Sequence, residues 1–136
     1  MKILGVDFGD SRTGFAISDA LGFGASVLDA YRSKSMKAVA EYTVSLAKEQ
    51  GVERIVLGYP KNMNGTLGPR ANKTRQLKTM LEELGDIPVI LWDERLTTVS
   101  AHNLMNETNI RGDKRKNSVD SISAAYILQG FLDSLK

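Results

Sequence analysis

The sequence predicts an α/β domain in which a five-stranded mixed sheet is flanked by helices. Three extended apolar segments, separated by turn residues, stand at the start of the chain. Two further short apolar runs, RIVLGY and IPVILW, each follow a stretch with helical periodicity. A meander of antiparallel strands that continues into helix-linked parallel strands is an α/β arrangement. The 136 residues have the size of a single domain, residues 1–136, with one hydrophobic core.

The first three strands are expected near residues 2–8, 13–19 and 23–31. GDSR separates the first two, and DALG lies between the second and the third. Gly, Asp and Ser are typical turn residues, so each of these short links reverses the chain. Strands joined by such short turns pair antiparallel, which predicts a three-stranded meander.

A first helix is expected over residues 35–50. Apolar and small residues recur there at helical spacing on one side, namely at Val39, Tyr42, Thr43, Leu46 and Ala47. Gly51 follows directly, at the place where glycine commonly ends a helix. RIVLGY, residues 54–59, is short and rich in apolar residues, as is typical of a buried parallel strand.

The remaining predicted elements are three helices and one strand. A helix is expected to begin near Pro69, since proline is favoured in the first helical turn, and to run to about residue 84. IPVILW, residues 87–92, is the fifth strand. A helix over 97–107 and a final helix over 118–135 follow. The final helix is apolar on more than one side, so it should pack against the sheet.

Connection rules predict the order of the strands in the sheet. Right-handed crossovers place the fourth strand beside the first and the fifth strand beyond it. The resulting spatial order is 3-2-1-4-5. This arrangement is that of the ribonuclease H-like fold.

Composition excludes several classes of site. The 42% hydrophobic and 25% charged content is typical of a globular domain. There are no cysteines, which excludes disulfides, thiolate zinc sites and cysteine nucleophiles. A single histidine, His102, cannot build a multi-histidine metal site. No apolar run is long enough for a membrane helix or has the form of a signal peptide, so we expect a cytoplasmic protein without a membrane partner.

Acidic residues gather at one predicted edge of the sheet. Asp7 lies near the end of the first strand, Asp93 and Glu94 come directly after the fifth, and Asp120 opens the final helix. Open α/β sheets bind ligands at the carboxyl ends of their parallel strands. The first and fifth strands lie two strand spacings apart, about 10 Å, which a metal ion and a long Glu side chain can bridge.

Converging carboxylates predict a site for Mg²⁺ or Mn²⁺, because these ions take oxygen ligands. A pair of such ions activates water and stabilises the leaving oxygen of a phosphodiester. Side chains alternate along a strand, so only one of Asp93 and Glu94 is expected to face Asp7.

Each acid also has a structural role open to it. Asp7 can accept hydrogen bonds from amides of the following turn. Asp120 lies where a negative charge favours the start of a helix. Asp93 and Glu94 can pair with Arg95. Taken one at a time, these roles are as good an explanation as metal binding, and the metal hypothesis depends on the acids lying together.

Four motifs stand in this order along the chain: GVDFGDSRTGFAISD, LGYPKNMNGTLGPRA, WDERLTT and DSISAAYILQGFL. Together they resemble the YqgF family, whose members are described as Holliday-junction resolvases or pre-16S ribosomal RNA nucleases of the ribonuclease H-like superfamily, and the resemblance spans residues 1 to about 132. The resemblance implies a catalytic and metal-binding triad of Asp7, Glu94 and Asp120, with Asp93 as the alternative acid. Related resolvases carry a further acid one helical turn before the last one, where this chain has Asn117.

Basic residues supply candidate contacts with nucleic acid. The net charge is only +2, so their distribution matters more than their number. Two segments are rich in Lys and Arg, and RGDKRK near a metal edge is a credible phosphate-binding arm. The candidates are Arg12, Lys61, Arg70, Arg95, Arg111, Lys114, Arg115 and Lys116. Gly5 and Gly9 are expected to leave room for a phosphate at the same edge.

The sequence therefore predicts a metal-dependent nuclease whose partner is structured RNA or branched DNA. Its activity would be processing of the 5′ end of pre-16S ribosomal RNA or resolution of Holliday junctions. Two other interpretations stay open: an RNA-binding module of low or no activity on the same fold, and a phosphate-binding domain of the actin-like ATPase type. A homodimer is compatible with junction resolution, which needs two active sites.

Overall fold

The computed structural model describes residues 1–22, 24–59, 68–93 and 121–135. The predicted helix over 97–107 lies outside these residues. The described elements are β1 (Ile3–Asp7), β2 (Arg12–Ser18), β3 (Ala25–Arg32), α1 (Met36–Gln50), β4 (Arg54–Tyr59), α2 (Pro69–Leu84), β5 (Val89–Asp93) and α5 (Ile122–Ser134).

The five strands form one sheet in the order β3-β2-β1-β4-β5. β1 pairs antiparallel with β2, and β2 pairs antiparallel with β3. β1 and β4 are parallel, as are β4 and β5. This topology confirms the predicted meander, the predicted order and the ribonuclease H-like arrangement.

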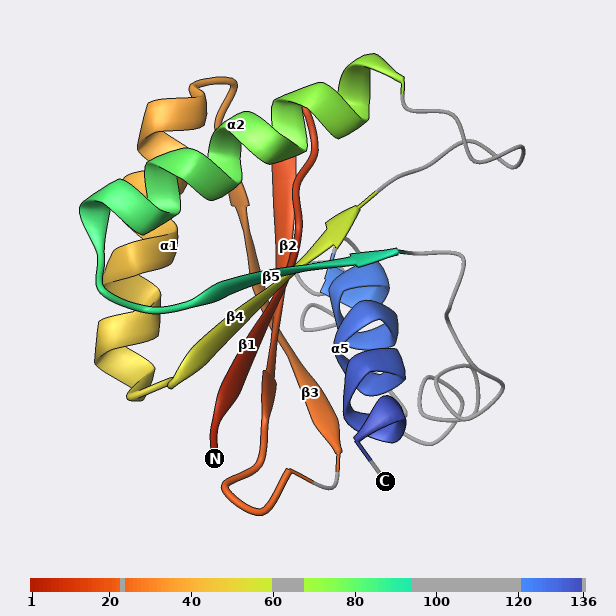
Figure 1. Cartoon of the computed structure of the whole chain (residues 1–136). Helices are drawn as coiled ribbons and strands as arrows, with labels where there is room; N and C mark the ends of the chain where they lie inside the picture. The colour runs from red at the N-terminus through yellow and green to blue at the C-terminus, as the bar shows by residue number, and fades with distance from the viewer. Residues whose placement is uncertain (23, 60–67, 94–120, 136) are drawn as a thin grey trace.

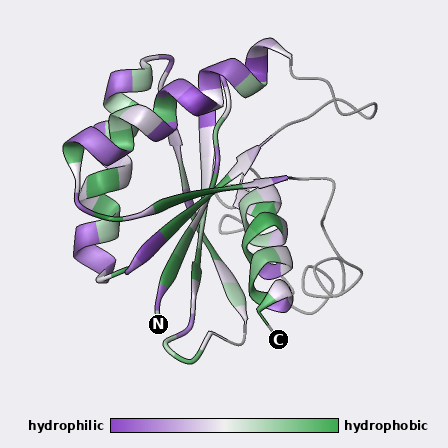
Figure 2. Cartoon of the chain, in the orientation of Figure 1, coloured by the Kyte–Doolittle hydropathy of each residue, from purple (hydrophilic) through white to green (hydrophobic). Residues whose placement is uncertain are grey.

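Helices cover both faces of the sheet. α1 and α2 lie on one face and α5 lies on the other (Figure 1). The strands are mostly hydrophobic, while α1 and α2 mix hydrophilic and hydrophobic residues along their length (Figure 2). The beginning of β1 and the end of α5 lie at the same end of the sheet, which is the lower end in Figure 1.

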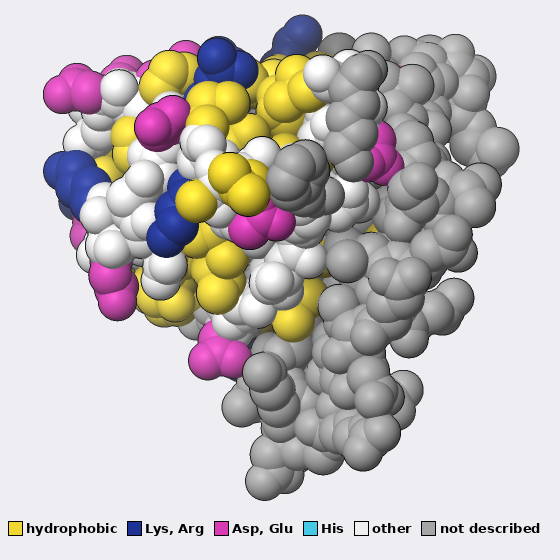
Figure 3. Space-filling model, turned by 90° about the horizontal axis from the view of Figure 1, so that it is seen from below, with side chains coloured by type: hydrophobic (Ala, Val, Ile, Leu, Met, Phe, Trp, Pro, Cys, Tyr) yellow, Lys and Arg dark blue, Asp and Glu magenta, His cyan; other side chains and the backbone are white. Residues whose placement is uncertain are grey.

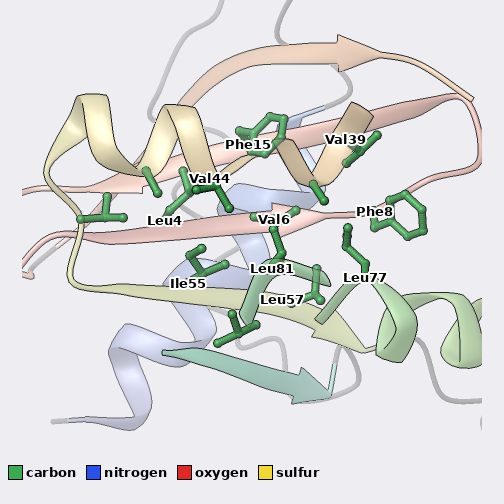
Figure 4. Packing of buried hydrophobic residues seen from close by; sticks show 14 residues of the cluster. Leu4, Val6, Phe8, Phe15, Val39, Val44, Ile55, Leu57, Leu77 and Leu81 are labelled. Atoms are coloured by element: carbon green, nitrogen blue, oxygen red, sulfur yellow. The ribbon is translucent and has the colours of Figure 1, made fainter. Parts of the chain in front are cut away.

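Alternation along the strands separates two hydrophobic clusters. Leu4 and Val6 of β1 pack with α1 and α2 in the first cluster, which Figure 4 shows. Ile3 faces the other way and belongs to the second cluster, which α5 closes. Because successive side chains point to opposite faces, the same alternation assigns every residue of a strand to one of the two layers.

α1 ends as predicted and begins with a side-chain cap. The Ser35 hydroxyl accepts a hydrogen bond from the Ala38 amide at 3.2 Å. Gly51 has φ 67° at the other end, a left-handed conformation that favours glycine. Val39, Thr43 and Ala47 are buried as predicted. Ala40 and Val44 are buried as well, while Tyr42 and Leu46 are half-buried and pack against the core.

Two strand boundaries differ from the predicted ones for local reasons. The Asp19 carboxylate accepts from the amides of Leu21 at 2.9 Å and Gly24 at 3.0 Å, so Leu21 and Gly24 belong to the turn and β3 begins at Ala25. β5 begins at Val89 because Pro88 before it has no amide hydrogen to donate. Within the described residues, no helix has the length and apolar character needed to cross a membrane.

Candidate active site

Asp7 is the last residue of β1, and Gly14 of β2 is its pairing partner. A Cβ added to Gly5 would meet the Leu128 Cβ and Ala124 carbonyl of α5, so Gly5 faces that helix. Side-chain alternation therefore assigns Asp7, two residues further, to the α5 face of the sheet. The Asp7 side chain is 20% exposed. A carboxylate thus lies at the carboxyl edge of the central strand, as the sequence predicted.

α5 begins at the same edge, where a buried hydrogen bond holds it. The Ser121 hydroxyl accepts from the Phe15 amide at 3.0 Å, and Ser121 is fully buried. Phe15 follows Gly14, the partner of Asp7. Further along α5, the Gln129 side chain accepts from the amide of Ala25, where β3 begins. α5 therefore runs antiparallel to β1 and begins near Asp7.

Ser121 is a structural residue that the sequence reasoning missed. The last helix was predicted from residue 118; the structure describes it from Ile122, with Ser121 directly before it, and residues 118–120 lie outside the described residues. Several serines stand in the segment NSVDSIS, so spacing alone does not choose between them. The bond to Phe15 depends on a tertiary contact. Asp120 immediately precedes Ser121 and lies outside the described residues.

Asp93 lies in β5, not after it as the sequence reasoning had assumed. It pairs with Tyr59 at the end of β4. Leu91 packs against the first cluster and Trp92 against the second, so alternation assigns Asp93 to the face that α1 and α2 cover. Asp7 belongs to the α5 face, which makes Asp93 the less suitable of the two adjacent acids. Glu94 lies outside the described residues.

α2 also begins at this edge and brings positive charge to it. The Arg70 Nη2 donates to the Phe8 carbonyl at 3.1 Å and lies 3.8 Å from the Asp7 Oδ1. One helical turn further, the Lys73 Nζ donates to the Asp10 carboxylate at 3.1 Å. Two ion pairs therefore connect α2 with the end of β1 and the turn that follows. At the opposite end of the sheet, acidic and basic side chains are scattered among apolar ones (Figure 3).

The other predicted nucleic-acid contacts are only partly described. Arg12 is exposed and begins β2, so it lies near the same edge as Asp7. Arg70 is exposed at the start of α2. The remaining candidates lie outside the described residues; these are Lys61, Arg95, Arg111, Lys114, Arg115 and Lys116.

Gly5 and Gly9 are needed for packing and for the turn, which corrects the prediction that they make room for a phosphate. A Cβ on Gly5 would lie 2.8 Å from the Leu128 Cβ and 3.0 Å from the Ala124 carbonyl oxygen. A Cβ on Gly9 would lie 2.4 Å from the Arg12 carbonyl oxygen. These distances are closer than ordinary contacts. Gly5 thus allows α5 to approach the sheet, and Gly9 allows the chain to turn between β1 and β2.

Among the described residues at this edge, Asp7 is the candidate ligand for a divalent metal ion. Asp7 provides carboxylate oxygens, the donor type that Mg²⁺ and Mn²⁺ prefer. Among residues 1–22, 24–59, 68–93 and 121–135, no group of three or more His, Cys, Asp or Glu is arranged to hold a metal ion. Two of the three acids of the predicted triad, Glu94 and Asp120, lie outside those ranges.

The strand order and the final helix that begins near an aspartate on the central strand define a domain of the ribonuclease H-like class. The model of one family, RuvX, described as Holliday junction resolvase, matches residues 1–134. The chain belongs to this family, which is also called YqgF. The resemblance seen in the four sequence motifs is thereby confirmed.

Relatives at high identity carry one name. A protein of Ruminiclostridium cellulolyticum named "Putative pre-16S rRNA nuclease" is 49% identical over 136 residues, which cover 99% of this chain and 96% of that protein. A protein of Clostridium novyi with the same name is 45% identical over 135 residues, covering 99% of this chain and 100% of that protein.

Solved structures at low identity share the fold. The RuvC protein of T. thermophilus, in complex with a Holliday junction substrate, aligns with a TM-score of 0.68 at 10% identity. The alignment covers 99% of this chain and 95% of RuvC. A Fowlpox virus resolvase in complex with Holliday junction DNA aligns with a TM-score of 0.60 at 14% identity, covering 99% of both chains. Both likenesses support the ribonuclease H-like fold.

Proposed function

We propose that this protein is a metal-dependent nuclease that hydrolyses phosphodiester bonds in structured nucleic acid. The observation that carries the proposal is the hydrogen bond from the Phe15 amide to the buried Ser121 hydroxyl at 3.0 Å. This bond fixes the start of α5 beside Phe15, which follows Gly14, the pairing partner of Asp7. Asp120 precedes Ser121 in the sequence, and this supports the proposal that Asp120 acts together with Asp7.

In this proposal, Asp7, Glu94 and Asp120 hold Mg²⁺ or Mn²⁺. When bound, such ions would supply activation of a water molecule and stabilisation of the leaving oxygen. Glu94 is preferred to Asp93 as the ligand because Asp93 belongs to the face of the sheet that α1 and α2 cover, whereas Asp7 belongs to the α5 face. The chain has no cysteine and a single histidine, and neither a thiolate nor a histidine pair is needed for hydrolysis by this route.

The proposed substrate is the 5′ end of pre-16S ribosomal RNA, in the cytoplasm. The name shared by relatives at 45–49% identity supports RNA. The family description supports branched DNA, and therefore Holliday junctions, as the second candidate. Junction resolution requires two cuts, and so it favours a homodimer. Sedimentation of the protein with and without a four-way junction distinguishes the two: a stable monomer in both cases favours RNA processing.

Cleavage assays test the proposal directly. Labelled pre-16S RNA, a four-way DNA junction and single strands are incubated with the protein and Mg²⁺ or Mn²⁺. We expect metal-dependent cleavage of one structured substrate, its loss in Glu94→Gln, and a smaller reduction in Asp93→Asn. The reverse order would move the metal ligand to Asp93. Substitution Asp7→Asn should abolish cleavage and weaken metal binding.

The two alternatives give different results in the same experiment. A binding module without activity would retain nucleic acid but leave every substrate intact with either ion. A phosphate-binding domain of the ATPase type would bind ATP tightly, and a calorimetric titration with ATP measures this. If Asp7 instead serves the turn that follows it, Asp7→Asn should destabilise the fold by roughly 0.5–2 kcal/mol, as the loss of a helix cap does, and leave cleavage intact.

A further inference from the structure

Arg70 is the cation closest to the proposed metal ligand Asp7 among the described residues. Its Nη2 lies 3.8 Å from the Asp7 Oδ1, a distance longer than a charge-assisted hydrogen bond. The same nitrogen donates to the Phe8 carbonyl at 3.1 Å, which holds the guanidinium near the end of β1. A guanidinium carries five N–H donors in a planar fork. Arg70 is therefore held close to Asp7 but does not bind it in the strong two-pronged arrangement.

The position of Arg70 in α2 is unfavourable for a purely structural cation. It lies in the first turn, where the helix dipole disfavours positive charge, and this turn has no acidic residue. The Arg70 side chain is 55% exposed, so an ion pair there adds little to stability. Lys78 on the same helix is placed differently, since it pairs with Glu82 one turn further along the helix. The ion pair with Asp7 thus adds little to stability, and the contact that holds Arg70 in place is its hydrogen bond to the Phe8 carbonyl.

We propose that Arg70 alternates between Asp7 and the substrate. While Asp7 holds no metal ion, the guanidinium neutralises its carboxylate. When Asp7 ligates an ion, the guanidinium turns to a non-bridging phosphate oxygen of the nucleic acid, whose geometry suits its planar fork. Arg70 therefore opposes metal binding in the free protein and supports substrate binding in the complex. This inference rests on the proposed function, in which Asp7 is a metal ligand.

The first test measures metal binding without substrate. Mn²⁺ is titrated into the protein and the free ion is counted by electron paramagnetic resonance. Removing a positive charge near Asp7 should tighten Mn²⁺ binding in Arg70→Gln by roughly two- to fivefold, the size expected for one exposed charge at this distance. Arg70→Lys keeps the charge and should bind Mn²⁺ as the wild type does. Lys78→Gln is the matched control on the same helix and should change nothing.

The second test measures nucleic-acid binding without metal. The Asp7→Asn protein is titrated against a labelled four-way DNA junction and a labelled RNA stem-loop in the presence of chelator. In this protein Arg70 no longer has the Asp7 carboxylate as its partner. Arg70→Gln in this background should weaken binding of the preferred probe several-fold. The loss of one phosphate contact should also reduce the slope of log affinity against log salt by about one. Lys78→Gln in the same background should leave the slope unchanged.

The outcomes separate this inference from the proposed function. If the wild type binds no Mn²⁺, or if Asp7→Asn leaves Mn²⁺ binding unchanged, the proposed metal site at Asp7 is wrong. If Asp7-dependent Mn²⁺ binding is present but Arg70→Gln leaves it unchanged or weaker, Arg70 does not oppose the metal and the inference is overturned. An unchanged salt slope in the second test overturns the phosphate contact. Opposite effects of Arg70→Gln on Mn²⁺ and on nucleic acid support both halves of the alternation.

Discussion

Substitution Ser121→Ala tests whether one buried hydrogen bond holds the start of α5 at the candidate site. The Ser121 hydroxyl accepts from the Phe15 amide at 3.0 Å, and both residues are fully buried. Alanine offers no acceptor, and a buried amide left without one costs about 1–3 kcal/mol. For a chain of this length, such a loss corresponds to a melting temperature lower by roughly 3–12 °C.

Urea unfolding and amide hydrogen exchange measure this effect. We expect the free energy of unfolding to fall by about 1–3 kcal/mol and the Phe15 amide to exchange faster in Ser121→Ala. Ser35→Ala is a matched control, because the Ser35 hydroxyl also accepts from a backbone amide, that of Ala38, but at an exposed helix start. It should cost about 1 kcal/mol and leave Phe15 protected. Unchanged exchange at Phe15 in Ser121→Ala would refute the reasoning.

Three further outcomes are expected. Gly5→Ala should lower the free energy of unfolding by about 1–3 kcal/mol in urea, because its Cβ would lie 2.8 Å from the Leu128 Cβ; an equal stability would mean that α5 is more loosely packed. Asp7→Asn should leave the metal-free protein as stable as the wild type or more stable in thermal melts, since its partner Arg70 is more than half exposed and the ion pair adds little. Burial raises the pKa of Tyr42 above its ordinary value of 10.0, so the neutral hydroxyl is favoured in the folded state. Its contribution to stability should be complete below pH 10.0 and lost as pH rises through the raised pKa, and Tyr42→Phe should reduce this dependence.

The general architecture could be predicted because it depends on local patterns and on connection rules. RIVLGY predicted β4 with its observed bounds, and Gly51 predicted the end of α1. The strand order followed from the handedness of crossovers. Asp7 was correctly assigned to the edge because it follows an apolar run, which marks the end of a strand whatever packs against it.

The features that could not be predicted depend on what packs against a residue. Gly5 is required because α5 lies against it, and nothing in its own segment reveals this contact. Ser121 is one of several serines in its segment, and its role comes from a bond to the distant Phe15 amide. Asp93 was expected after the strand because a carboxylate interrupts an apolar run, but pairing with Tyr59 continues the strand by one residue. Tertiary contacts therefore decided the details that local pattern left open.

The direction of α5 across the sheet has a practical consequence for surface-based measurements. β1 begins and α5 ends at the end of the sheet opposite to Asp7 (Figure 1). A short flexible linker attached at either end of the chain would therefore anchor the molecule by the side remote from its carboxylate edge. Molecules tethered this way to a sensor chip or a microscope slide would present that edge to the flowing solution. Binding and cutting of individual nucleic-acid molecules could then be followed on immobilised protein. Moving the anchor from one end of the chain to the other would serve as an internal check.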